Sequence, residues 1–312
     1  HLSIRRQRQM CIRDSSDMSP VTVPHGFVEE YIFNPTPDSL RQRVLEAHDH
    51  LRRECEVLVV EGTGHAGVGS CFDLSNAEVA AMLGLQVLLI VEGGIGSALD
   101  QTSLNLSLFK AKQVKMLGVV ANKVFPEKRD RIARALERGL ANLGERFLGA
   151  IPFEERITYP RVGQIAKETQ AEVLCGEHAL DRRIEHVLVA AMEPQNVVPR
   201  ILPHSLMITP GDRIDNILVA LNSKLSLSDT RARVEALLLT GGLLPHFTIV
   251  TLMKESGLPV LLSQENTYEV SAMVQGKIFK ILPEDTDKIE RAQKLVMDYI
   301  DTNAVLEAVA EK

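Results

Sequence analysis

Apolar runs of strand length recur along the first half of the chain. They are almost continuously hydrophobic, as is typical of parallel strands covered on both faces, and they lie at residues 55–62, 85–91, 114–124 and 147–152. Apolar residues at helical spacing flank these runs and predict helices at residues 39–54, 74–83, 96–113 and 127–143. Strands that alternate with crossover helices predict a parallel, doubly wound sheet.

The same alternation returns after a less regular stretch at residues 159–181. It predicts strands at residues 186–192, 205–211, 234–242 and 258–264. It also predicts helices at residues 212–225, 245–256, 267–275 and 286–299. We therefore expect a second, smaller α/β domain. The expected boundaries are a leader at 1–16, a first domain at 17–165, a linker at 166–183, a second domain at 184–301 and a tail at 302–312.

Composition narrows the class of protein. The 312 residues are 45% hydrophobic and 24% charged, which is enough for two cores without a disulfide or metal. A net charge of −6, 4% aromatic residues and no Trp argue against nucleic-acid binding. The four cysteines are widely spaced, form no CxxC pair and suit a reducing compartment. No apolar run approaches the ~20 residues that span a bilayer, so we expect a cytoplasmic protein without membrane partners.

The first residues differ from the rest of the chain. His1–Ser15 is basic, shows no periodicity and does not begin with Met. The string RQRQMCIRDS resembles translated sequencing-adapter read-through, and a basic targeting arm is the biological alternative. We favour a non-native leader and leave it out of the prediction of the fold.

Glycine-rich and polar residues follow the predicted strands of the first domain. The candidate site residues at these strand ends are Glu61, Gly62, Thr63, Gly64, Gly93, Gly94, Gly96, Asn122 and Lys123. Ligands of parallel sheets bind at the carboxyl ends of the strands. Glycines let backbone amides approach an anion, and a helix that begins at Gly96 adds a favourable dipole. A carboxylate such as Glu61 beside a phosphate suits magnesium.

Each of these signals has a plainer interpretation. A GxG turn is often only a tight connection, Glu61 could be a solvated or capping carboxylate, and Asn122 could be a turn residue. His65 could hold a phosphate or could be an exposed loop histidine. Their shared position at one edge of one sheet favours a binding site.

The order of these motifs resembles a known family. VVEGTGHAGVGS, VLLIVEGGIGSALDQTSLNL, LGVVANKV and LGAIPF follow one another as in the dethiobiotin-synthetase-like domain of long bacterial phosphate acetyltransferases. Stand-alone AAA-type or cobyrinic-acid-synthase-like ATPases carry the same domain, and the resemblance runs from Met18 to Ile165. It implies ATP and Mg as cofactors, with Glu61 near the phosphates and magnesium, Asn122 at the base and Pro152 in the base pocket.

One hallmark of that family is missing. Its domain opens with a strand and a GxxxxGK[ST] loop, whereas the single GK pair here, Gly276–Lys277, lacks the upstream glycine. We expect that truncation of the gene before Asp17 accounts for both the missing loop and the unusual leader. The first domain is thus predicted to be a P-loop-type doubly wound parallel sheet without its first strand and P-loop.

The second domain resembles the DRTGG domain from Ile184 to Ile300. Asp212–Arg213 and Thr240–Gly241–Gly242 carry this resemblance. Asp212 and Arg213 could clamp a small-molecule ligand opposite the Thr240 hydroxyl and the amides of Gly241 and Gly242. Equally, Asp212 could be a helix N-cap and the glycines a plain turn.

Two functions follow from these resemblances. The first is an ATP-binding regulatory or accessory protein related to the N-terminal region of phosphate acetyltransferase, without the acetyltransferase domain. The alternative is an ATP-dependent enzyme that activates carboxylates, of the dethiobiotin synthetase or cobyrinic acid a,c-diamide synthase type. No Cys-His pair suited to an amidotransferase domain is visible, which favours the first function. An exposed sheet edge also predicts a homo-oligomer.

Overall fold

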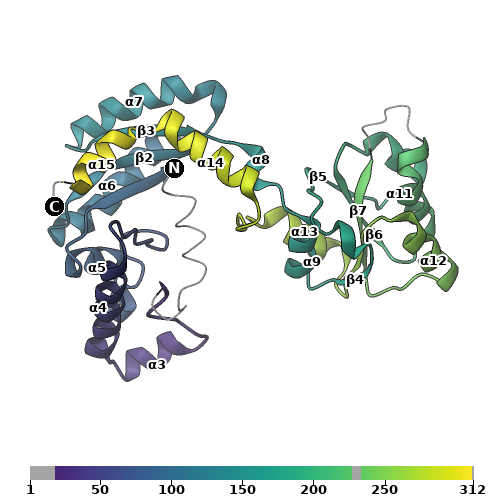
Figure 1. The fold of residues 1–312 in the computed structure, drawn as a ribbon, viewed down its shortest axis with the longest axis horizontal. Coiled ribbons are helices and arrows are strands. Elements are labelled where there is room, and N and C mark those ends of the chain that lie inside the picture. Colours follow the sequence, from purple (N-terminus) through teal and green to yellow (C-terminus); the bar gives the residue numbers. More distant parts are fainter. Residues whose placement is uncertain (1–17, 227–232, 311–312) are drawn as a thin grey trace. The chain divides into compact units, whose positions relative to one another are not determined.

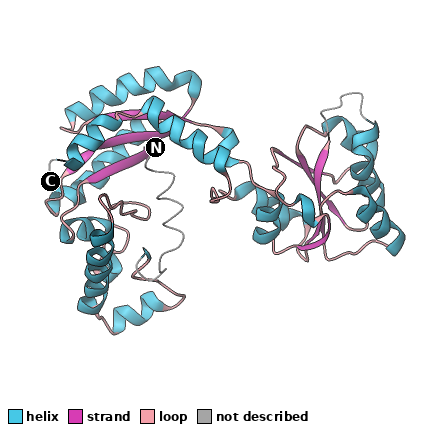
Figure 2. Cartoon of the chain, viewed as in Figure 1, coloured by secondary structure: helices cyan, strands magenta, loops and turns pink. Residues whose placement is uncertain are grey.

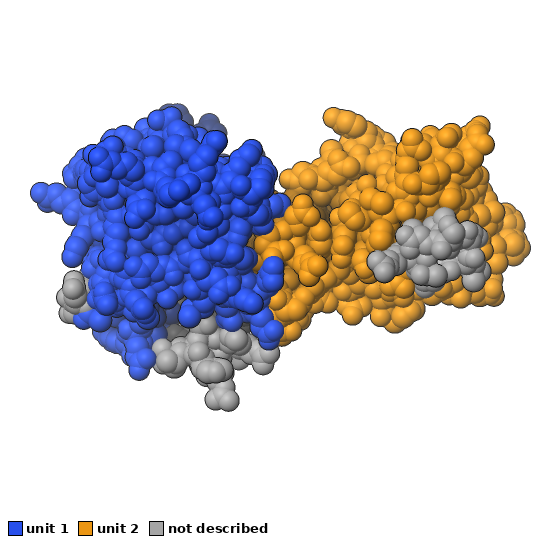
Figure 3. All heavy atoms as spheres, turned by 90° about the horizontal axis from the view of Figure 1, so that it is seen from above, with its two compact units in different colours: residues 1–153, 289–312 blue, residues 154–288 orange. Residues whose placement is uncertain are grey.

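The computed structural model describes residues 18–226 and 233–310. The expected leader at 1–16 therefore lies outside the described residues. The chain divides into two compact units (Figure 3): residues 154–288 form unit 2, and residues on either side of them, 1–153 and 289–312, form unit 1.

Unit 1 contains a three-stranded parallel sheet in the order β1-β2-β3 (Figure 1). Its strands are β1 (Val87–Glu92), β2 (Met116–Val124) and β3 (Phe147–Pro152). The helices that follow or cover the sheet are α6 (Gly96–Ala111), η2 (Pro126–Lys128), α7 (Arg129–Asn142) and α15 (Thr302–Ala310). Residues of α6 and α7 pack with Val119 and Ala121 on one face, and Ala304 of α15 packs with Val120 and Leu148 on the other. The predicted strand–helix order of this region is confirmed.

A helical layer precedes this sheet along the chain. It consists of α3 (Phe27–Phe33), α4 (Pro37–Glu54), η1 (Ser70–Phe72) and α5 (Asn76–Met82). The Tyr31 ring packs edge-on against the Phe72 ring, and the Tyr31 hydroxyl donates a hydrogen bond to the Phe72 carbonyl. Helix α4 buries Leu40 and Val44, and the Ser75 side chain caps α5 by accepting a hydrogen bond from the Glu78 amide at 3.1 Å.

The prediction of a buried strand at residues 55–62 is wrong. This segment pairs with no strand in the described part of the chain, and Val59 is 83% exposed. Within residues 18–226 and 233–310, strand β1 pairs with β2 alone, and its Leu88 and Ile90 are exposed, so it is an edge strand of the described sheet rather than a fully buried one. An apolar run forms a strand only where a neighbouring backbone accepts its hydrogen bonds, and composition does not supply that neighbour.

Unit 2 contains a five-stranded sheet in the order β4-β8-β7-β6-β5, which Figure 2 shows in magenta. Its strands are β4 (Glu172–Cys175), β5 (His186–Val189), β6 (Ser205–Pro210), β7 (Val234–Thr240) and β8 (Val260–Leu262). Its longer helices are α9 (Val162–Glu168), α11 (Ile214–Ser226), α12 (Phe247–Ser256) and α13 (Thr267–Gly276). Its short helices are α8 (Glu155–Thr158), η3 (Glu177–Ala179), α10 (Pro194–Val197) and η4 (Val198–Arg200). Leu237 and Leu239 of β7 enter one core and Leu238 enters the other, so both faces of the sheet are covered.

Two expected domain boundaries differ from the compact units. Residues 166–183, expected to be a linker, supply the end of α9 and strand β4, which pairs antiparallel with β8. Helix α14 (Thr286–Tyr299) begins in unit 2, but most of it and all of α15 belong to unit 1. The amide of Asp301 donates to the Leu148 carbonyl of β3, and this bond fixes the chain end to the unit 1 sheet.

A buried group of charges holds the start of α14 within unit 2. The Asp285 carboxylate is fully buried and accepts hydrogen bonds from Arg161 Nε at 2.6 Å and from the Leu282 amide at 2.9 Å. Burial works to raise the pKa of Asp285, but these two donors and the nearby Lys288 charge hold it below its usual value. Burial lowers the pKa of Lys288, which donates to the Tyr159 carbonyl.

We expect Asp285→Asn to lower the free energy of unfolding of unit 2 by about 3 kcal/mol, because it leaves the Arg161 guanidinium without a charged partner. The pKa of Asp285 is depressed in the folded state, so its contribution is present above the unfolded pKa of about 3.9. This contribution to stability is lost as the pH falls through the lower pKa that Asp285 has in the folded state. Urea unfolding monitored by hydrogen exchange of β7 amides measures both effects.

The matched control is Glu168→Gln. Glu168 pairs with Lys277 at 2.7 Å on the surface of the same unit, so the cost should stay below about 1 kcal/mol. Equal losses in the two variants would mean that burial adds nothing to the Asp285 pair.

Candidate functional site

Four of the predicted site residues of unit 1 lie together at the carboxyl edge of its sheet: Gly93, Asn122, Lys123 and Pro152. In the strand register Glu92 lies opposite Asn122, and Val124 lies opposite Pro152. A Cβ atom added to Gly93 would lie 2.7 Å from the Val124 Cα and 2.9 Å from the Lys123 carbonyl oxygen. Only glycine permits this approach, which joins the turn after β1 to the end of β2.

The amino terminus of α6 opens at this edge without a cap. Among the described residues, no side-chain cap bonds to its first amides, and its first turn holds no acidic residue. Gly96 has no atom within 4 Å of where a Cβ would stand, and Ser97 is exposed. Lys123, also exposed, has a left-handed backbone (φ +57°), and its amide donates to the Asn122 side chain at 2.9 Å. Free helix amides and a lysine at one edge suit an anion.

A separate loop carries Glu61, Gly62, Thr63 and Gly64. Hydrogen bonds hold this loop to α5 and to the middle of α6. The Asn76 side chain donates to the carbonyls of Thr63 and His65, and the Ala66 amide donates to Asn105 at 2.7 Å. Asn105 lies about 13 Å along α6 from its amino terminus. Among the described residues no hydrogen bond joins Glu61–Gly64 to the turn after β1, so the structure does not gather all the predicted residues in one place.

His65 and Glu92 bear on which residues of this region could contact a phosphate or a metal ion. The His65 Nδ1 accepts a hydrogen bond from the Gly67 amide at 3.2 Å, so this nitrogen stabilises its own loop. Glu92, which the sequence did not single out, places an exposed carboxylate beside Asn122 at the strand end. Its position directly before the glycine turn was the signal that could have identified it.

A fit to ATP and magnesium is therefore partial. The free amides of α6 and Lys123 suit phosphate charge. Within residues 18–226 and 233–310, no three His, Cys, Asp or Glu side chains gather as a metal-binding group, so these residues do not form a protein cage for magnesium.

In unit 2 the predicted residues lie in turns that interlock at the carboxyl edge of the sheet. The Gly241 amide donates to the Glu265 carbonyl at 2.7 Å, and the Gly242 amide donates to the Ser263 carbonyl at 2.9 Å. Both glycines have positive φ, and the buried Thr240 hydroxyl bonds to Thr267 Oγ1 at 2.7 Å. The turn after β7 is thereby fixed to the end of β8.

Arg213 also bonds within the fold. Its Nε and Nη2 donate to the Asp215 carboxylate at 3.0 and 2.8 Å, and Nη2 also donates to the Met192 carbonyl. The hydrogen bond from Arg213 lowers the pKa of Asp215, outweighing burial, and raises that of Arg213 itself. Asp212 is exposed beside them. Ligand contact by these signature residues stays a prediction, because the bonds that the structure shows connect the strand-end turns to one another.

One polar atom near these turns has no partner. Asn216 is fully buried, and its Nδ2 donates to the carbonyls of Ala190 and Met192 at 3.0 Å. Its Oδ1 accepts no hydrogen bond from the described residues. Asn216, Asp215 and Thr267 carry no motif that singles them out in the sequence, and the fold brings them to this edge.

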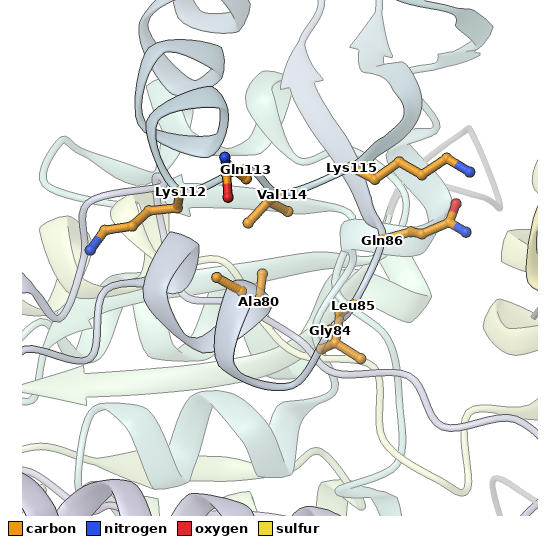
Figure 4. A pocket seen from close by; sticks show the side chains of 9 residues that line it. Ala80, Gly84, Leu85, Gln86, Lys112, Gln113, Val114 and Lys115 are labelled. Atoms are coloured by element: carbon orange, nitrogen blue, oxygen red, sulfur yellow. The ribbon is translucent and has the colours of Figure 1, made fainter.

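A cavity of about 420 Å³ lies away from all these residues (Figure 4). Its lining comes from the end of α5 and the segments that lead into β1 and β2: Ala80, Ala81, Gly84, Leu85, Gln86, Lys112, Gln113, Val114 and Lys115. Lys112 is paired with Glu78 and Gln86 donates to the Ala308 carbonyl, so part of its polar lining is engaged by the fold. None of the predicted site residues lines it.

Comparison with known proteins assigns both parts of the chain. Residues 12–161 match the AAA domain, and residues 164–276 match the DRTGG domain. Phosphate acetyltransferase of Nitratidesulfovibrio vulgaris is 29% identical over 283 residues, which cover 88% of this chain and 40% of that protein. The enzyme of the same name from Synechocystis sp. is 29% identical over 278 residues, covering 86% and 39%. The chain thus matches the AAA domain in its first part and the DRTGG domain in its second, and it spans about two-fifths of the length of these relatives.

A solved structure shares a weaker likeness. It holds the CBS and DRTGG domains of the regulatory region of Clostridium perfringens pyrophosphatase, complexed with the activator diadenosine tetraphosphate. The identity is 22%, the match covers 38% of this chain and 46% of that chain, and the TM-score is 0.31. These values are too low for the ligand of that protein to be transferred to this one.

The interlocked turns of unit 2 predict a steric effect at Gly211. A Cβ at this buried residue would stand 1.7 Å from the Leu243 carbonyl oxygen, so Gly211→Ala must displace the turn after β7. We expect a loss of about 1–3 kcal/mol in the free energy of unfolding, measured by urea denaturation. Gly276→Ala is the control, since nothing lies within 4 Å of its Cβ position, and it should be neutral or slightly stabilising. A neutral Gly211→Ala would refute the close packing of the two turns.

Proposed function

We propose that this protein is an ATP-binding regulatory or accessory protein, with the nucleotide phosphates at the amino terminus of α6. The observation that supports this most is the contact of Gly93 with the backbone of Lys123 and Val124, which brings the end of β2 against the turn that leads into the uncapped helix α6. Asn122 and Pro152 at the same edge are then the residues proposed for the base. The AAA domain match over this unit supports a nucleotide-related role.

Binding by this chain alone should be weak. The sequence contains no GxxxxGK[ST] segment, and that loop supplies most of the phosphate contacts in P-loop proteins. The remaining amides and one lysine suit a dissociation constant of about 1 mM or weaker, which corresponds to roughly 4 kcal/mol of binding free energy.

The exposure and position of Glu61, the predicted catalytic residue, favour a regulatory role over catalysis. Glu61 is exposed and lies on a loop that Asn76 and Asn105 fasten away from the turn after β1. The relatives named phosphate acetyltransferase match this chain over about two-fifths of their length, and we propose a role connected with such an enzyme. A small molecule at the DRTGG turns is a second proposed ligand.

We also propose a cytoplasmic protein. The described cysteines, Cys55, Cys71 and Cys175, are free thiols, as a reducing compartment requires. Among residues 18–226 and 233–310, no helix combines the length and apolar character needed to cross a membrane.

The test places a negative charge where the phosphate should bind. Ser97→Asp puts a carboxylate in the first turn of α6, where it should stabilise the helix by about 0.3–1 kcal/mol and repel an incoming anion. We expect the affinity for ATP and pyrophosphate, measured by calorimetric titration at millimolar concentrations, to fall at least about fivefold. Circular dichroism during thermal unfolding measures the gain in stability.

Ser107→Asp provides the matched control, because Ser107 is exposed on the same helix, far from its amino terminus. It should leave ATP affinity unchanged. Equal ATP affinity in wild type and Ser97→Asp would eliminate the proposed site, and micromolar affinity of the wild-type chain would contradict the expected weak binding.

A further inference from the structure

Three basic side chains surround one buried carboxylate at the amino-terminal edge of the unit 2 sheet. Glu235, in β7, is 2% exposed. Its Oε1 accepts a hydrogen bond from Arg233 Nε and lies 3.2 Å from His204 Nδ1. Its Oε2 lies 3.7 Å from Arg182 Nη1. The bases come from the segments that lead into β5, β6 and β7, so the sheet itself brings them together.

This group holds more positive charge than Glu235 needs. One cation neutralises a buried carboxylate, but Arg182 and Arg233 both lie beside it, and His204 is a third base. Two guanidinium groups and one carboxylate leave a net charge of +1 before His204 is counted. Since like charges repel in a partly buried place, the second arginine adds positive charge beyond what Glu235 neutralises.

Several donors in this group remain unused. Arg233 engages Glu235 through Nε, and its side chain is 45% exposed. The Nη1 of Arg182 is buried but forms no hydrogen bond in the described part of the chain. The His204 ring faces Glu235 through Nδ1, which leaves Nε2 on a side chain that is 44% exposed. The buried Arg182 Nη1 already faces Glu235 Oε2, so the donors open to an acceptor from solution are the exposed ones of Arg233 and His204.

The backbone holds two of these residues in place. The Arg182 carbonyl accepts from the Val162 amide at 2.9 Å, and its amide donates to the Ala179 carbonyl at 3.2 Å. His204 has a left-handed backbone (φ +54°), and its carbonyl accepts from the Glu185 amide at 3.0 Å. A left-handed conformation is unfavourable for a non-glycine residue, so the surrounding structure imposes it.

We infer that Arg182, His204 and Arg233 form a binding site for a phosphate group, with Glu235 as the positioning residue. Guanidinium groups present paired donors that match phosphate oxygens. The His204 Nε2 can form a further hydrogen bond with a phosphate oxygen. The site lies at the opposite end of the strands from the DRTGG turns and does not depend on nucleotide binding in unit 1.

Inorganic phosphate is the first probe, titrated calorimetrically into the full chain, with sodium chloride at equal ionic strength as the reference. We expect saturable binding that weakens about tenfold in Arg182→Gln and in Arg233→Gln, because each variant loses a charge-assisted contact. Arg200→Gln is the matched control. Its guanidinium donates to the Asn196 carbonyl on the surface of the same unit, and its removal should leave affinity unchanged.

A second ligand identifies the source of the phosphate group. Glycerol 3-phosphate that binds at least as tightly as inorganic phosphate, with the same loss in the variants, supports the site and favours a phosphorylated metabolite. Binding of inorganic phosphate alone supports the site and favours the free ion. Absence of saturable binding by both ligands overturns the inference, as does equal affinity in wild type and the two glutamine variants.

Folding of the variants is checked independently. Arg233→Lys keeps a positive charge beside Glu235 but loses the paired donors, so it should remain folded and still bind phosphate more weakly. Thermal unfolding of each protein, with and without phosphate, separates the two roles. If the cluster served only to neutralise Glu235, the variants would melt earlier and phosphate would not raise the melting temperature of the wild type.

Discussion

Backbone N–H and C=O groups of a parallel strand need partners on a neighbouring strand, and this need decides which apolar segments form the sheet of each unit. Every strand in unit 2 pairs with a neighbour, and β7 at the centre is buried along its whole length. In unit 1 the sheet has only three strands, so β1 presents one side without a partner among the described residues. The apolar segment at 55–62 has strand composition, yet it pairs with no strand among the described residues. Pairing, rather than hydrophobicity, separates these two outcomes.

The turns at the strand ends follow from this pairing. Because parallel strands end at one edge, the glycine turns of each unit meet there and pack against one another. In unit 2 the contact is so close that Gly211 has no room for a side chain, and the signature residues Arg213, Thr240 and Gly241 bond mainly to neighbouring turns. In unit 1 the corresponding edge keeps free helix amides beside Lys123, which is why the proposed nucleotide site lies there.

Charged side chains form ion pairs in unit 2, including at three places that differ in their balance of charge. Asp285 and Arg161 fasten the start of α14 as a matched pair, and Arg213 and Asp215 connect two strand-end turns. Glu235 differs from these because it gathers more bases than it can satisfy. The first two arrangements link parts of the fold, and we infer that the exposed donors of the third serve an additional acceptor.

The sequence by itself determined the α/β class, the order of most strands and helices, and the positions of the glycine turns. Local periodicity and turn chemistry encode these features, and Ser75 and Gly241 behave as their residue types predict. The tertiary structure alone decided that 55–62 lacks a partner, that β4 joins the second sheet and that the last helices belong to unit 1. It also decided the charge groups, since Arg161 and Asp285 are 124 residues apart and no local pattern links them. Long-range pairing depends on which surfaces meet, and a one-dimensional pattern does not contain that information.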